Sequence, residues 1–297
     1  MQANRRHTHR VAGKMVANEP WWIRWSLIGF TWFVIGGLIL VPVLYVFVQA
    51  LEPGLQEYWK ALTADPDTRH SIFLTLTVAP VVVVLNTIFG VIAAWCITRF
   101  KFPGRTLLIT ILDVPFAVSP VVVGLCFMLL FGRQGYFGPM LRDAGIPVAF
   151  AYPGLVLATT FVTLPFVARE LIPLMQSLGS DEEVAAVSLG ASPWQLFWRV
   201  TLPNIKWGLV YGIIQCNSRA IGEYGAVFVV SGHIAGKTDT MPLRVQKLFE
   251  ESKMSQSFAL ASLLTLMALV TLLAKILLER YLAAQEAARA AEHGPTE

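Results

Sequence analysis

The sequence predicts an all-α membrane protein, a bundle of about six transmembrane helices. Hydrophobic residues make up 55% of the 297 positions and charged residues only 14%, whereas soluble domains carry roughly 25% charge. The mean hydropathy is +0.60. Several apolar stretches reach about 20 residues, the length that a helix needs to cross the hydrocarbon core. Inside a bilayer the backbone must pair internally, which favours helices over open strands.

The predicted spans follow one another along most of the chain. The first is too long for the apolar region of a signal peptide, about 7–15 residues, so we expect an uncleaved anchor. The three cysteines lie in predicted spans and suggest apolar packing without a disulfide framework. We expect an N-terminal arm over 1–24, a membrane domain over 25–280 and a C-terminal tail over 281–297. The predicted spans are 26–48, 72–97, 107–131, 152–171, 207–231 and 258–278.

The positive charges are distributed unevenly between the two sides of this predicted bundle. With the N-terminus inside, the inner segments carry most of the 23 lysines and arginines. The positive-inside rule then predicts a multi-pass protein of the bacterial inner membrane with both termini in the cytoplasm. Because the basic residues follow this pattern, the net charge of +4 does not indicate nucleic acid binding. Arg219 is the only basic residue that we place in the middle of a span.

The inner loop over 172–206 predicts a helix-turn-helix. Ser180 or Asp181 can cap a first helix, with acidic residues in its first turn. Gly190 can end that helix in the left-handed conformation. Ser192 is a second N-cap, and the prolines at 193 and 203 suit a first helical position and a helix end. The second helix carries an apolar stripe of Trp194, Leu196, Phe197 and Val200.

Two interpretations of the inner loop stay open from its residues. An apolar, aromatic face on a projecting helix pair can bind a soluble partner. The same amphipathic segment can lie on the bilayer surface.

Two predicted spans contain polar residues. Arg219 and Glu223 are four residues apart and would share a helix face. Intramembrane charges indicate function by default, although a self-satisfied ion pair can also tighten a bundle. The third span contains Asp113, Ser119 and two nearby prolines. Such a break can line a cavity or be a plain kink.

The inner loop resembles the EAA loop of ATP-binding-cassette (ABC) importer permeases. The resemblance lies in Ala185 to Gly190, then nine residues, then Val200 to Pro203. Val184 stands where the family usually has Glu, and Glu183 comes one place earlier. In that family the loop fits into a cleft of an ATPase subunit. The resemblance implies coupling roles for Glu183, Ala185, Ala186, Gly190, Ser192, Pro193, Trp194, Leu202 and Pro203.

The runs 114–122 and 219–226 resemble the sulfate/thiosulfate branch of these permeases, the CysW type. The resemblance implies a type I importer permease fold. We expect no catalytic or metal site in this chain, because the sequence contains no nucleophile elbow, no paired catalytic carboxylates and no convincing metal-ligand spacing. The resemblance also implies a homologous permease subunit, a dimer of ABC ATPases that bind the ATP, and a periplasmic sulfate/thiosulfate-binding protein. Candidates for the translocation path are Arg219, Glu223, Asp113 and Ser119.

Several alternatives stay open. The run around Glu223 is shared with molybdate permeases, so another oxyanion is an alternative substrate. A secondary transporter would use Arg219 and Glu223 for proton coupling. A membrane enzyme would need a catalytic cluster that the sequence lacks. The segment 232–238 is one residue short of a P-loop and lies on the predicted outer side.

Overall fold

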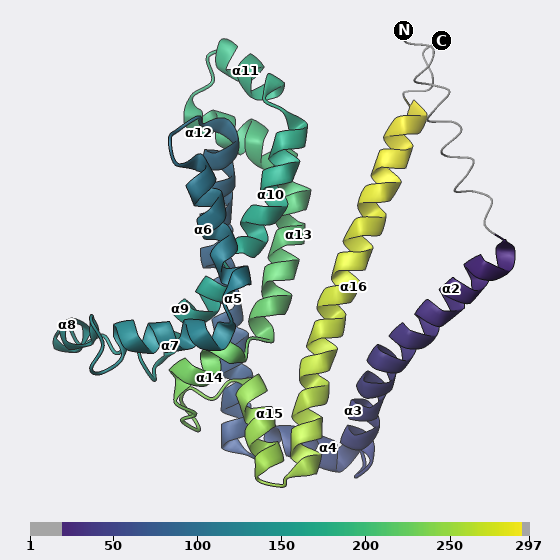
Figure 1. Cartoon of the computed structure of the whole chain (residues 1–297), viewed down its shortest axis with the longest axis vertical. Coiled ribbons are helices and arrows are strands. Elements are labelled where there is room, and N and C mark those ends of the chain that lie inside the picture. Colours follow the sequence, from purple (N-terminus) through teal and green to yellow (C-terminus); the bar gives the residue numbers. More distant parts are fainter. Residues whose placement is uncertain (1–19, 293–297) are drawn as a thin grey trace.

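The computed structural model describes residues 20–292, with side chains described for 20–284. Every regular element in this part of the chain is a helix, which confirms the predicted class (Figure 1). The elements are α2 (Trp21–Ile35), η1 (Gly36–Leu40), α3 (Val41–Leu51), α4 (Leu55–Thr63), α5 (Pro66–Arg99), α6 (Arg105–Ala117), α7 (Pro120–Phe131), α8 (Gly138–Asp143), α9 (Tyr152–Thr163), α10 (Pro165–Leu178), α11 (Asp181–Ser188), α12 (Pro193–Leu196), η2 (Phe197–Thr201), α13 (Leu202–Ile221), α14 (Gly225–Ser231), α15 (Met241–Glu250) and α16 (Met254–Glu292).

Four of the predicted spans correspond to long apolar helices. By length and composition alone, four helices in the described residues could cross a membrane, and up to five if one bent pair counts as a span. The helices α2, η1 and α3 form one of them, and α9 with α10 forms another. Each of the four is longer than we predicted, because the turns that flank the apolar core are also helical. Their bounds are Trp21–Leu51, Pro66–Arg99, Tyr152–Leu178 and Met254–Ala284.

The predicted span over 107–131 is not one continuous helix. It is divided into α6 and α7, which are bent by 107° relative to each other. Val118 and Ser119 between them have extended backbone angles, and Pro120 opens α7. A proline disfavours helical geometry at the residue before it and lacks the N–H that a continuous helix would need. The break is therefore much sharper than a kink.

The predicted span over 207–231 is interrupted as well. The helix α13 ends at Ile221, and α14 begins only at Gly225. A Cβ atom at Gly225 would lie 2.9 Å from the Cβ of Pro120, and one at Gly124 would lie 2.7 Å from the carbonyl oxygen of Ala226. The absence of side chains at both glycines therefore allows α14 to pack closely on α7.

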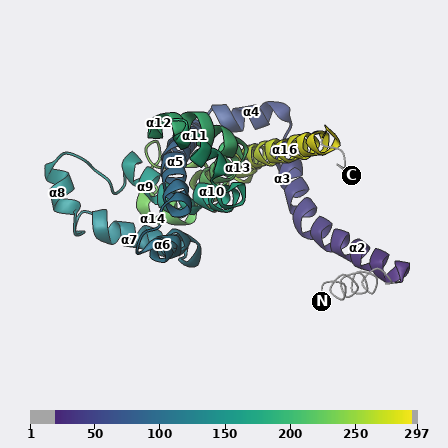
Figure 2. The same cartoon turned by 90° about the horizontal axis from the view of Figure 1, so that it is seen from above.

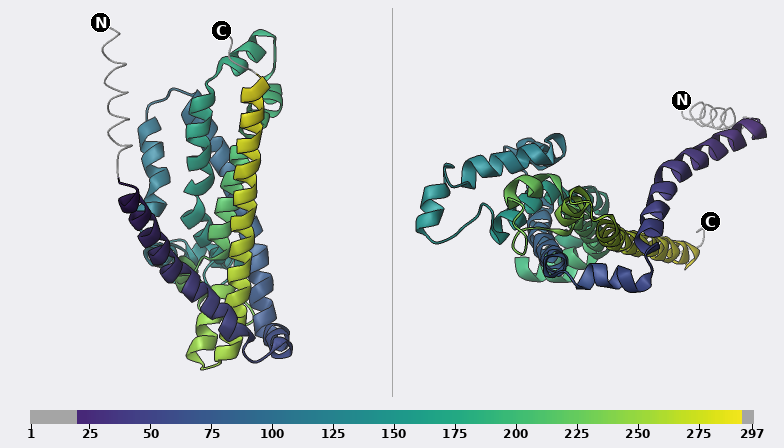
Figure 3. Two further views of the ribbon diagram at one scale, coloured as in Figure 1. Left: turned by 90° about the vertical axis from the view of Figure 1, so that its right-hand side faces the viewer. Right: turned by 90° about the horizontal axis from the view of Figure 1, so that it is seen from below.

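The central helix of the bundle is α5. Its Val82 is buried with Leu155 of α9 and Leu243 of α15, and Val91 is buried with Leu171 of α10. The helix α2 stands apart from this bundle, and α8 projects on the opposite side (Figures 1 and 2). The end of α16 lies at the same end of the molecule as α11 and α12, α4 and α15 lie at the other, and α2 begins between the two ends (Figures 1 and 3). The buried core thus lies between the two ends.

The end of α5 far from α11 and α12 carries an ion pair between a half-buried aspartate and a buried arginine. Asp65 is the N-cap of α5 and accepts hydrogen bonds from the Asp67 backbone N–H at 3.2 Å and the Thr68 hydroxyl at 2.7 Å. An Nη atom of Arg244 on α15 lies 2.5 Å from Asp65 Oδ2, and its side chain is only 5% exposed. Arg244 therefore joins α15 to the first turn of α5.

Candidate functional site

The two short helices α11 and α12 with their linker, residues 181–196, form a knob at one end of the molecule (Figure 1). Ser180 is the N-cap of α11, but its side chain makes no capping hydrogen bond. Gly190 follows α11 with a φ of +85°, as predicted, and a Cβ there would meet nothing within 4 Å. This position therefore favours glycine for its backbone conformation and not for space.

The second helix begins as predicted and ends differently. Ser192 and Gln195 form a capping box, with Pro193 at the start of α12. The prediction that Pro203 ends this helix is wrong, because the chain continues through the π-helix η2 into α13. Pro203 lies in the first turn of α13. The missing N–H is tolerated there because the wider turn of η2 has already changed the hydrogen-bond register.

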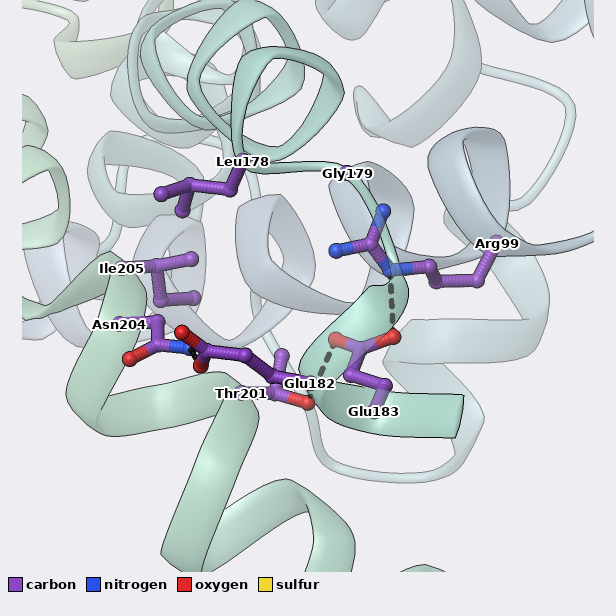
Figure 4. A pocket seen from close by; sticks show the side chains of 8 residues that line it. All are labelled: Arg99, Leu178, Gly179, Glu182, Glu183, Thr201, Asn204 and Ile205. Atoms are coloured by element: carbon purple, nitrogen blue, oxygen red, sulfur yellow. Dashed lines mark hydrogen bonds and ion pairs between the residues drawn. The ribbon is translucent and has the colours of Figure 1, made fainter. Parts of the chain in front are cut away.

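An ion pair holds the inner side of the knob against the bundle (Figure 4). An oxygen of Glu183 on α11 lies 2.6 Å from Nε of Arg99, the last residue of α5, and both side chains are at most 15% exposed. The Thr201 hydroxyl donates a 2.9 Å hydrogen bond to the same carboxylate. Nη1 of Arg99 also donates to the Met175 carbonyl oxygen of α10 at 3.1 Å. Glu183 thus connects the knob to α5 and η2.

The outer side of the knob is apolar and exposed. Leu189 is 90% exposed and Trp194 71%. Beside them lies a hollow of about 300 Å³. The predicted apolar stripe is divided, because Phe197 turns inward, with its ring centroid 5.4 Å from that of Trp95. The hollow is lined by Ala186, Leu189, Gly190, Ala191, Gln195, Arg199 and Val200.

The predicted coupling residues therefore fall into two groups. Glu183 points into the molecule, and Ala186 and Leu202 are half-buried. The other six are exposed, but Pro203 lies in the first turn of α13 rather than on the knob. Exposed on the knob are Ala185, Gly190, Ser192, Pro193 and Trp194.

Arg219 and Glu223 form the expected pair, but not along one helix. Glu223 lies in the break after α13, and its Oε2 is 2.7 Å from Nη1 of Arg219. The Glu223 side chain is 1% exposed and that of Arg219 is 35% exposed. The other carboxylate oxygen accepts a 3.0 Å hydrogen bond from the Ala226 backbone N–H. One acidic side chain thus connects α13, the break and α14.

Asp113 has a partner that we did not predict. Its Oδ1 lies 3.0 Å from Nε of Arg169 on α10. Ser119 is exposed in the break between α6 and α7, and its hydroxyl caps nothing. The structure does not pair Asp113 with Arg219 or Glu223. Arg169 falls near the end of the predicted span over 152–171, and no local pattern predicts Asp113 as its partner.

Comparison with known proteins places the chain in a family. Residues 86–284 match the family described as "binding-protein-dependent transport system inner membrane component". The sulfate transport system permease protein CysW of Escherichia coli (strain K12) is 51% identical over 89% of this chain and 91% of its own length. The permease protein CysT of the same organism is 35% identical over 79% and 84%, respectively.

A solved structure shares the fold. It is a bacterial alginate ABC transporter in complex with an alginate-bound periplasmic protein, and the match has a TM-score of 0.72 at 17% identity. The alignment covers 88% of this chain and 95% of that one. The fold is therefore that of an ABC importer permease, and the chain belongs to the family of binding-protein-dependent transport system inner membrane components.

Proposed function

We propose that this chain is the membrane-spanning permease subunit of an ABC importer for sulfate or thiosulfate. The observation that carries the proposal is the knob, an exposed apolar surface joined by a buried ion pair to the ends of the membrane helices. The substrate class follows from the relatives named for sulfate transport. A secondary transporter would have no use for this knob.

The knob would lie in the cytoplasm and dock into a cleft on an ABC ATPase subunit. Leu189, Trp194 and the hollow between α11 and η2 supply the apolar contacts. Movement of the ATPase would reach α5 through the Glu183–Arg99 pair and α13 through η2. The ATPase dimer binds the ATP, and this chain hydrolyses nothing and holds no cofactor.

The remaining partners follow from the same arrangement. A homologous permease of the CysT kind would complete the translocation path, since relatives of both kinds are named for sulfate transport. A periplasmic binding protein would deliver the anion at the end formed by α4 and α15. Both termini would be cytoplasmic, on the side of the knob, and the chain would lie in the bacterial inner membrane.

The Arg219–Glu223 pair would contribute to the path. A tetrahedral dianion in a low-dielectric barrier needs positive charge or N–H donors. Arginine stays charged and offers two parallel donors to an oxyanion. Glu223 would hold the guanidinium between passages. Ser119 is exposed in the neighbouring break, where Pro120 faces Gly225, and would add a hydroxyl to this region.

Reconstitution tests the proposal. The chain, its partner permease and the ATPase are placed in proteoliposomes, and uptake of radiolabelled sulfate is followed with the binding protein outside. We expect uptake that requires both the binding protein and ATP hydrolysis and that stops with a hydrolysis-deficient ATPase. Uptake driven by a proton gradient without the ATPase would contradict it. Competition by thiosulfate and molybdate separates the sulfate class from the other oxyanion class.

A further inference from the structure

The ion pair between Arg169 and Asp113 lies within the apolar part of the bundle. Arg99 contacts the carbonyl oxygen of Met175 and marks the level at which α5 ends near the knob. Arg169 is six residues before Met175 on α10, hence about 9 Å deeper. Asp113 is eight residues into α6 from Arg105, hence about 12 Å from the start of that helix. Both charged side chains are therefore at membrane depth.

This pair is exposed on the bundle surface. The side chains are 54% and 44% exposed for Arg169 and Asp113. Charged groups at membrane depth normally face a water-filled cavity or another protein chain, because hydrocarbon solvates them poorly. On α16 the exposed side chains include Leu272 and Leu273. The surface of α6 also exposes apolar side chains such as Ile111, so it is the charged pair itself that calls for water or another protein chain beside it.

The guanidinium of Arg169 is held on one side and open on the other. Asp113 binds its Nε atom, and its Cζ atom lies 4.8 Å from the centre of the Phe116 ring. Phe116 is in turn fixed by an edge contact with Phe166, with centroids 5.3 Å apart. Among the described side chains, no other hydrogen bond, ion pair or ring contact involves this guanidinium. Its two Nη groups therefore remain as donors for two oxygens of an anion.

We propose that Arg169 binds the transported oxyanion at the knob-side end of the path. The inference rests on the proposed function, and it adds a second anion contact to Arg219. The two arginines are at different depths, since Arg219 lies near the opposite end of α13. Asp113 orients the guanidinium and offsets part of its charge. A dianion is therefore bound by fixed donors yet still released into the cytoplasm.

Accessibility is tested first, in the full complex in lipid nanodiscs. The variant Phe116→Cys, which lies against the Arg169 guanidinium and keeps both charged residues, is made after replacing the three native cysteines. A negatively charged methanethiosulfonate reagent should label it, and saturating sulfate, but not chloride of equal ionic strength, should slow the labelling. Leu273→Cys, on the apolar face of α16, is the matched control and should stay unlabelled. An unreactive position 116, or labelling that sulfate does not slow, overturns the proposal.

Coupling efficiency is tested second. In proteoliposomes, Asp113→Asn/Arg169→Gln should move about tenfold less sulfate per ATP hydrolysed, because the dianion loses its charge-assisted donors. Arg169→Lys, which keeps a positive charge at this position, should recover part of the uptake. An unchanged ratio of sulfate to ATP, or a parallel loss of uptake and ATP turnover, makes the pair a structural contact and overturns the proposal. Failure of the proposed function is a different result, because the unmodified complex would then show no ATP-dependent sulfate uptake.

Discussion

The two ends of α5 are both fixed by ion pairs, yet their surroundings differ. At the knob, Arg99 binds Glu183 beneath an exposed apolar surface. At the other end, Asp65 binds Arg244, and the neighbouring Asp239 is also buried, with a side chain that is 1% exposed. The first pair connects a projecting element to the bundle, and the second joins elements that are already packed. On the proposed function, the ion pair at the knob would transmit movement, whereas the pair at the other end stabilises the fold.

The largest effect should come from the turn of the knob. Gly190→Val places a β-branched residue at a φ of +85°, a conformation that such residues resist. We expect normal insertion but no sulfate uptake, because the two helices of the knob no longer meet the ATPase correctly. Gly29→Val is the matched control, since it lies in α2 with nothing within 4 Å of its Cβ. Substrate-stimulated ATP turnover retained by Gly190→Val would show that the knob does not couple.

Substitutions in the Arg219–Glu223 pair at the end of α13 should reduce sulfate uptake nearly as strongly. Arg219→Ala should lose uptake and destabilise the bundle by about 3 kcal/mol, since it leaves the buried Glu223 carboxylate without its charge partner. Arg219→Gln with Glu223→Gln should restore assembly, measured by thermal unfolding in detergent, but not transport. Native uptake by that double variant would mean that the pair is only structural.

Loss of the contact under the knob should have an intermediate effect. Glu183→Gln removes the charge that Arg99 faces at 2.6 Å, so we expect roughly tenfold slower uptake from a charge-assisted contact of this kind. Glu182→Gln is the control, because Glu182 contacts Asn204 at the exposed edge of the same region. Equal uptake by the two variants would contradict a role for Glu183 in transmission.

Loss of the Asp65–Arg244 pair, at the end of α5 far from the knob, should reduce stability more than transport. Burial alone would raise the pKa of Asp65, but hydrogen bonds from Thr68, Arg244 and the Asp67 backbone N–H, with the Arg244 charge, lower it below its ordinary value. A lowered carboxyl pKa stabilises the fold at neutral pH, and this stabilisation is lost as the pH falls through the folded-state value. Asp65→Asn should therefore cost about 2 kcal/mol at pH 7.

The pH dependence of this variant provides its own control. The difference in unfolding temperature between Asp65→Asn and the unmodified protein should shrink in acid, while uptake at pH 7 stays close to normal. A difference that persists at low pH would show that hydrogen-bond geometry, and not charge, holds this end.

The sequence by itself determined the membrane class, four of the spans and the caps of the knob. These features depend on residues within a turn or two of one another. Runs of about 20 apolar residues need a bilayer, Gly190 permits the left-handed turn, and Ser192 with Gln195 caps a helix. Because these signals depend only on neighbouring residues, they can be recognised in a single sequence.

Only the tertiary structure decided which charges meet. Arg99 with Glu183 and Arg169 with Asp113 come from distant parts of the chain, and no local pattern specifies such partners. The same holds for the breaks between α6 and α7 and between α13 and α14. Prolines and glycines allow a break, but the packing of α7 on α14 decides that the chain turns by 107° instead of kinking. Long-range packing selects one of the conformations that the local sequence permits, because its contacts outweigh weak local preferences.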